Sequence, residues 1–167
     1  FETGCEKGLF DGLEISKEEG LCSQYMGRYP VISLSLKGVN GSDYATARSL
    51  LCSAVGNEAL RFQFLLEDDS LTEPEKQLYM QIIRVDPSGA GRFLMSDSVL
   101  MESLKTLSAL LEKHFGQKVI VLIDEYDVPL SKADEQGYYE EMTLLIRNMF
   151  EQVLKTNDSL FFAVLTG

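Results

Sequence analysis

Two neighbouring carboxylates follow an apolar run in the segment 119–127, which reads VIVLIDEYD. The apolar run predicts that Asp124 and Glu125 lie at the carboxyl end of a buried strand, where α/β sheets bind ligands. Successive strand side chains point in different directions. One acid can therefore hold a hydrated Mg²⁺ while the other faces a nucleophilic water, which is the arrangement of a Walker B element in phosphoryl transfer. Solvated acids at a polar turn are the simpler alternative.

The other residues that could do chemistry form weaker patterns. The dipeptide Gly-Lys does not occur, so the phosphate-binding loop GxxxxGK[ST] is absent from these 167 residues. The glycine-rich segment 87–92 (PSGAGR) follows no predicted strand and is interpreted as a surface turn. His114 is the only histidine and lies in the last turn of a predicted helix, where a cation complements the helix dipole. Asp124, Glu125 and Asp127 leave a metal-dependent phosphoesterase as a third hypothesis, which needs one more converging ligand.

Hydrophobic periodicity predicts the elements that must position these acids. The predicted strands are 30–36, 118–124 and 159–166. The last two are nearly continuous apolar runs, typical of parallel strands covered on both faces. The predicted helices include 99–115, which ends at Gly116, and 139–155, and the interval from about 42 to 116 is interpreted as a helical insert. Helices alternating with buried strands predict an α/β fold with a parallel sheet and right-handed crossovers.

Length and composition exclude several classes of protein. With 167 residues, 45% hydrophobic and 25% charged, the chain has the size and composition of one globular domain. Its 15 Lys and Arg against 26 Asp and Glu give a net charge of −11, which opposes direct nucleic-acid binding. No apolar run approaches the roughly 20 residues of a membrane span. Three cysteines without a CxxC pair suit neither a disulfide framework nor a zinc site, and they predict reduced thiols in a cytoplasmic protein.

Four segments occur together in an order that suggests a family. They are 27–38 (GRYPVISLSLKG), 119–130 (VIVLIDEYDVPL), 137–142 (GYYEEM) and 154–167 (LKTNDSLFFAVLTG). On these segments the chain resembles the bacterial AAA-ATPase-like family from end to end. The resemblance implies a P-loop NTPase-like fold of the ASCE type, with three layers in the order α/β/α and strand 118–124 in the centre of the three. Family members often continue into a PD-(D/E)XK nuclease-like region.

The resemblance also implies roles for particular residues. Asp124 matches the Mg²⁺-associated Walker B aspartate, and Glu125 matches the catalytic acid that polarises the attacking water. Thr166 falls where such folds place a polar sensor near the γ-phosphate, so it is expected to contact the nucleotide. The implied cofactors are ATP and Mg²⁺. Asp127 belongs to the DEYD signature, and capping of the turn that follows is sufficient to explain it.

By the same resemblance, residues 1–167 are expected to be one partial domain, truncated at both ends, with the phosphate loop upstream. We expect it to carry the Walker B half of an ATP-binding, ATP-hydrolysing regulatory or motor module and to be inactive alone. The alternative is a degenerate P-loop module that serves protein interaction or scaffolding. Strand 159–166 would have lost its neighbour in the sheet, and such an apolar edge predicts self-association through residues 160–165.

Overall fold

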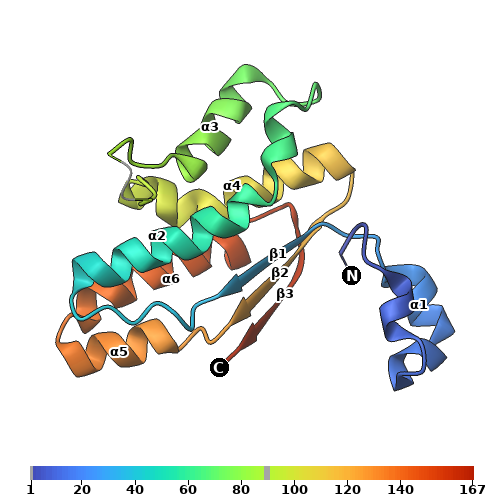
Figure 1. The fold of residues 1–167 in the computed structure, drawn as a ribbon, viewed down its shortest axis with the longest axis horizontal. Coiled ribbons are helices and arrows are strands. Elements are labelled where there is room, and N and C mark those ends of the chain that lie inside the picture. The colour runs from blue at the N-terminus through green and yellow to red at the C-terminus, as the bar shows by residue number, and fades with distance from the viewer. Residues whose placement is uncertain (1, 89–90) are drawn as a thin grey trace.

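The computed structural model of the chain describes residues 2–88 and 91–167 and contains a parallel sheet of three strands (Figure 1). The strands are β1 (Val31–Ser35), β2 (Val119–Asp124) and β3 (Leu160–Thr166). They lie in the order β1-β2-β3, so β2 is central. Each predicted strand is confirmed to within one residue at either end, and the predicted central position of the second strand is confirmed as well.

Helices form most of the remaining regular structure. They are α1 (Glu19–Tyr25), α2 (Tyr44–Leu60), α3 (Glu73–Ile83), α4 (Asp97–Phe115), α5 (Val128–Gln136) and α6 (Tyr139–Lys155), together with the 3-10 helices η1 (Lys7–Phe10), η2 (Glu14–Lys17) and η3 (Gln63–Leu66). The helical insert between about 42 and 116 is confirmed, and α4 ends at Gly116 in the left-handed conformation, with φ 65°. Helix α5 has no counterpart in the sequence prediction, because its nine residues, VPLSKADEQ, hold too few apolar side chains to form a stripe.

The described residues form two layers, which corrects the expectation of three. Helices α2, α4 and α6 cover one face of the sheet (Figure 1). The strand order runs in one direction, and both connections between parallel strands are crossovers. Right-handed crossovers that step in the same direction place their helices on the same face of the sheet. A crossover helix on the opposite face would need the strand order to reverse.

The two faces of the sheet differ in burial for the same reason. Ile32, Val121 and Ile123 belong to the main hydrophobic core and are at most 1% exposed. The residues between them point to the other face, where Leu122 is half-buried and Val164 is 43% exposed. We call this second side the open face. Strand β2 is therefore buried more completely on its helix side than on its open side.

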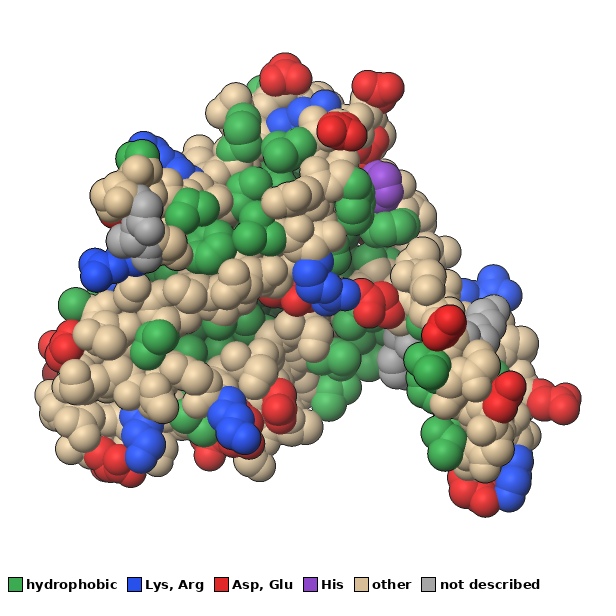
Figure 2. Space-filling model, viewed as in Figure 1, with side chains coloured by type: hydrophobic (Ala, Val, Ile, Leu, Met, Phe, Trp, Pro, Cys, Tyr) green, Lys and Arg blue, Asp and Glu red, His purple; other side chains and the backbone are tan. Residues whose placement is uncertain are grey.

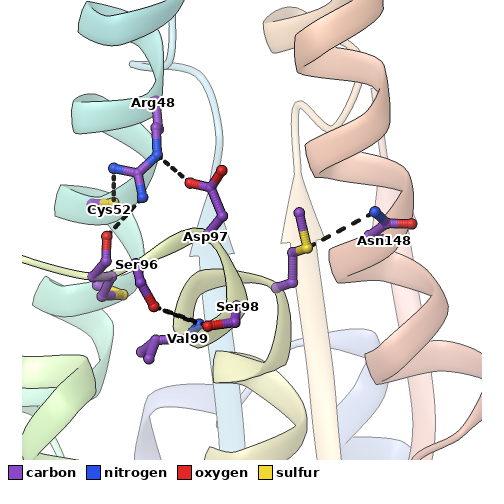
Figure 3. Close-up of polar contacts among 9 residues, drawn as sticks. Arg48, Cys52, Ser96, Asp97, Ser98, Val99 and Asn148 are labelled. Atoms are coloured by element: carbon purple, nitrogen blue, oxygen red, sulfur yellow. Dashed lines mark hydrogen bonds and ion pairs between the residues drawn. The ribbon is translucent and has the colours of Figure 1, made fainter.

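A guanidinium clasp holds the start of α4 against α2 (Figure 3). Arg48 on α2 donates from Nε to Asp97 Oδ1 at 2.6 Å and from Nη2 to the carbonyl oxygen of Met95 at 2.7 Å. Ser96 caps the same helix, since its hydroxyl accepts from the Val99 N–H at 3.3 Å. The two Arg48 bonds join segments about 50 positions apart in the sequence and hold α4 against α2.

The GYYEEM segment has an anchoring role. Gly137 ends α5 with φ 82°, and Tyr138 then enters the core with 6% of its surface exposed. The Tyr138 hydroxyl donates to the carbonyl oxygen of Gly41 at 2.6 Å, and its ring meets Tyr44 edge-on at 6.5 Å. The segment therefore ties the α5–α6 junction to the loop that follows β1.

Residues 2–27 form an arm that lies to one side of the helical body (Figure 1). The arm carries η1, η2 and α1. Several of its large apolar side chains are exposed, including Leu9 at 71% and Leu21 at 50%. Figure 2 shows hydrophobic side chains on the side of the arm that faces the body. Val164 on the open face is 43% exposed, so the arm does not cover the whole of that face.

Candidate functional site

The candidate site lies at the carboxyl ends of the three strands. Asp124 is the last residue of β2, and the parallel register places it beside Ser35 on β1 and Thr166 on β3. Residues paired across neighbouring strands point to the same face of a sheet. A polar row of a hydroxyl, a carboxylate and a second hydroxyl therefore crosses the open face at its carboxyl edge.

Thr166 orients the carboxylate of Asp124. The Thr166 hydroxyl donates to Asp124 Oδ1 at 2.5 Å, a short distance typical of a bond to a charged acceptor. The backbone of Asp124 is held as well, because its carbonyl oxygen accepts from the Leu36 N–H at 2.9 Å. The side chain is exposed, and among residues 2–88 and 91–167 no partner is recorded for its second oxygen, Oδ2. One oxygen is thus fixed and the other is free to bind a ligand.

Glu125 adopts an unusual backbone conformation directly after the strand. Its φ is 56°, and no other non-glycine residue in the described part of the chain has a positive φ. A side chain in this region costs on the order of 1 kcal/mol, and such strain concentrates at functional sites. The turn is held by two bonds: the Tyr126 N–H donates to the Thr166 carbonyl at 3.1 Å, and the Val128 N–H donates to the Glu125 carbonyl at 3.2 Å.

A groove with a volume of about 340 Å³ lies on the open face in front of the polar row. Its polar lining comes from Ser33, Ser35, Asp124 and Thr166, and Glu125 is not among its lining residues. The structure therefore brings Asp124 and Thr166 into direct contact, while the two neighbouring acids are directed to different surroundings. The serines are absent from the sequence prediction, although the alternation in PVISLSL could have shown that they share the face opposite Ile32.

Asp127 does not act as the predicted side-chain cap. Helix α5 begins directly after it, but the bonds from the Leu130 and Ser131 N–H groups go to the Asp127 carbonyl oxygen, and its carboxylate caps nothing. That carboxylate packs against Gly167, where an added Cβ would lie 2.6 Å from Asp127 Oδ1. A side chain at position 167 would therefore have to displace the Asp127 carboxylate.

The remaining sequence candidates lie elsewhere or are not supported. Within the described residues, no three His, Cys, Asp or Glu side chains are grouped so that they could hold a metal ion, as the phosphoesterase hypothesis requires. His114 is hydrogen-bonded through Nδ1 to Asp68 Oδ2 at 2.6 Å. A hydrogen bond from the Ser70 N–H and, second to it, this bond with His114 lower the pKa of Asp68 to about 2. Residues 89–90 of the PSGAGR segment lie outside the described residues, and the Asp86 N–H closes the surrounding turn on the carbonyl of Arg92 at 2.8 Å.

The oxygen ligands at this edge suit Mg²⁺ better than a metal ion that is held by protein side chains alone. Mg²⁺ is usually held by one or two carboxylates together with substrate phosphates and water. The exposed Asp124 carboxylate, with one oxygen fixed by Thr166, offers one such oxygen ligand. A cluster of three protein ligands is not needed for this kind of site.

These features define an α/β protein with a parallel sheet and a candidate ligand site at the carboxyl ends of its strands. A family model matches residues 1–167, and the chain belongs to this AAA-ATPase-like family, which is described as "Predicted AAA-ATPase". The search of curated proteins and the search of solved structures gave no match. Membership of this family is consistent with a protein of the ATPase class. No helix in the described ranges has both the length and the apolar character needed to cross a membrane.

Proposed function

We propose that the carboxyl edge of the sheet is the Walker B half of an ATP and Mg²⁺ site in a regulatory or motor module. The observation that carries the proposal is the bond from Thr166 to Asp124 at the end of the central strand, directly before Glu125. Membership of the AAA-ATPase-like family supports the same class of chemistry. The alternative, a module for protein interaction or scaffolding, would keep the acids only as the end of a strand.

In this proposal Asp124 binds Mg²⁺ through Oδ2, because Oδ1 already accepts from Thr166. The metal, when bound with ATP, would supply positive charge that offsets the negative charge of the phosphates. Thr166 acts mainly as a positioning residue, since its hydroxyl fixes the plane of the carboxylate. A direct bond from the same hydroxyl to a phosphate oxygen of the nucleotide would require the hydroxyl to rotate away from Asp124, because it has one proton and phosphate oxygens only accept.

Glu125 orients the water that attacks the terminal phosphate. Its left-handed backbone turns the side chain out of the row that Asp124 occupies, so the two carboxylates do not compete for one position. A carboxylate in this role accepts a hydrogen bond from the water and directs its lone pair at phosphorus. Replacement of Glu125 by glutamine removes the negative charge and the basic carboxylate that polarises the water, and it leaves the metal ligand in place.

The phosphate cradle must come from outside these 167 residues, because they contain no Gly-Lys dipeptide. The proposal therefore predicts that this chain neither binds ATP at micromolar concentration nor hydrolyses it unaided. In a longer polypeptide that includes a GxxxxGK[ST] loop, Glu125→Gln should lower kcat by orders of magnitude while nucleotide stays bound. Equal kcat values for the wild type and the variant would contradict the role of Glu125, and absence of hydrolysis in the wild type would favour scaffolding.

The metal ligand can be tested on the 167-residue chain itself. Titration with Mn²⁺ in the NMR tube should broaden the amide signals of Ser35, Thr166 and Gly167 at the lowest metal concentrations. Asp124→Asn should abolish this broadening. The matched control is Asp134→Asn, an exposed aspartate on α5 that makes the same change in charge. Broadening that survives in Asp124→Asn, or that spreads evenly over the acidic surface, would refute the assignment.

A further inference from the structure

Ser35 places a second hydroxyl beside Asp124, on the β1 side of the acid. It is the last residue of β1, and its partner across the sheet is Asp124. Residues paired in this way point to the same face of a sheet, and both side chains line the groove on the open face. Neighbouring strands lie about 4.8 Å apart. The hydroxyl and the carboxylate are therefore near neighbours.

The backbone around Ser35 is fixed, although the side chain itself is exposed. The Leu36 N–H donates to the Asp124 carbonyl oxygen at 2.9 Å, so the pairing of β1 with β2 extends to the residue after the serine. The Leu36 side chain is fully buried, and its carbonyl oxygen accepts from the Val39 N–H at 2.9 Å. A group on a rigid element keeps its position more precisely than one on a loop.

The two hydroxyls that flank Asp124 differ in their hydrogen bonds. The Thr166 hydroxyl donates its one proton to Asp124 Oδ1. For the Ser35 hydroxyl, no hydrogen bond is recorded within residues 2–88 and 91–167. The two oxygens of a carboxylate diverge from one carbon, so Oδ2 points away from the Thr166 hydroxyl. The unoccupied oxygen of the acid and the unoccupied hydroxyl of Ser35 thus belong to the same polar row.

We propose that Ser35 positions a water molecule of the Mg²⁺ that Asp124 binds, by accepting a hydrogen bond from that water. The inference rests on the proposed function, because it requires the metal on Asp124 Oδ2. Mg²⁺ sites in proteins usually keep several waters, each about 2.1 Å from the ion. One such water is long enough to reach from the metal across the spacing between β2 and β1. A serine hydroxyl has two lone pairs with which to accept.

The two hydroxyls then have separate roles on the two sides of the acid. Thr166 fixes the plane of the carboxylate, and Ser35 fixes one water of the ion that the carboxylate holds. Groups that hydrogen-bond to the ligands of a metal contribute to its affinity as well as to its orientation. Loss of one hydrogen bond of this kind weakens binding by about two- to tenfold. Ser35 is therefore a positioning residue.

Ser33 offers a comparison within the same strand. Its side chain is exposed on the open face and lines the same groove. It lies two residues, or about 6.6 Å, farther from the carboxyl edge, and its partner on β2 is Leu122. A hydroxyl at this position is too far from Asp124 to hold a water of the bound ion. The effect on metal binding should therefore be specific to Ser35.

Mn²⁺ alone is the probe, titrated into the 167-residue chain and followed through the amide signals of Thr166 and Gly167. Ser35→Val and Ser35→Thr introduce side chains of similar shape, both common in strands, and only the threonine keeps a hydroxyl. We expect Ser35→Val to raise the Kd for Mn²⁺ by about two- to tenfold. Ser35→Thr and the control Ser33→Val should both keep a Kd close to that of the wild type. Circular dichroism of each variant verifies that the fold is retained.

The possible results separate this inference from the proposed function. If Asp124→Asn abolishes the broadening but Ser35→Val and Ser35→Thr share one Kd, the role of Ser35 is wrong and the metal ligand stands. A lower Kd in Ser35→Val also overturns the role, because the hydroxyl would then compete with the metal for Asp124. If the broadening survives in Asp124→Asn, or never occurs, the metal site and the role of Ser35 are both wrong.

Discussion

Removal of the Tyr138 hydroxyl tests how the α5–α6 junction is held. The hydroxyl donates to the buried carbonyl of Gly41 at 2.6 Å, and only 6% of the tyrosine is exposed. Burial raises the pKa of Tyr138, so the group stays protonated and able to donate. Tyr138→Phe keeps the ring but leaves the Gly41 oxygen without this donor. A lost hydrogen bond together with an unsatisfied buried acceptor lowers the free energy of unfolding by about 1–3 kcal/mol.

Urea denaturation followed by circular dichroism measures this loss. With an m value of about 2 kcal/mol per molar urea, the midpoint should fall by about 0.5–1.5 M. The neighbouring Tyr139 is 46% exposed, so Tyr139→Phe makes the same chemical change on the surface. We expect this control to stay within about 0.5 kcal/mol of the wild type. If the two variants unfold at the same midpoint, the anchoring role of the GYYEEM segment is wrong.

Two further predictions concern the edge of β1 and the loop that follows it. Burial raises the pKa of Glu58 in the folded protein, and the hydrogen bond from the Ser33 N–H opposes this rise. The stability that Glu58 contributes is therefore complete below its ordinary pKa and is lost as the pH rises through the pKa of the folded state. Glu58→Gln keeps an acceptor oxygen but cannot ionise, so its melting temperature should fall less than that of the wild type between about pH 4 and 7. If the melting temperatures of the two proteins depend on pH in the same way, the prediction is wrong. A Cβ on Gly41 would lie 2.3 Å from the backbone nitrogen of Ala47. Gly41→Ala should therefore lower the free energy of unfolding, measured by chemical denaturation, by about 3 kcal/mol or more. Gly38→Ala, where nothing lies within 4 Å of the added atom, is the matched control, and equal stability of the two variants would refute the steric argument.

Local patterns were sufficient for most of the secondary structure. The three strands and the long helices α4 and α6 follow from runs and stripes of apolar residues within one segment. The start of α3 is equally local, because the Thr72 N–H donates to Glu75 Oε2 at 2.6 Å within a capping box. Helix α5 escapes the prediction because it is short and mostly polar. Its position depends instead on packing against α6.

The sequence predicted only part of the candidate site. The apolar run before Asp124 shows that an acid lies at a strand end, and this is confirmed. The bond from Thr166 joins residues 42 positions apart, and Ser35 comes to the same row from a third strand. No local pattern encodes such a pairing, since it depends on the register between strands. The left-handed backbone of Glu125 is likewise set by the turn bonds that follow β2.

By itself, then, the sequence determined the three strands, the long helices α4 and α6 and which strand carries the acids, because these depend on side-chain period and on neighbours a few residues apart. The tertiary structure alone decided that helices α2, α4 and α6 cover one face, that Glu58 accepts from the Ser33 N–H, and that Thr166 meets Asp124. These features depend on the direction of the crossovers and on contacts between distant segments, which the order of residues along the chain does not display.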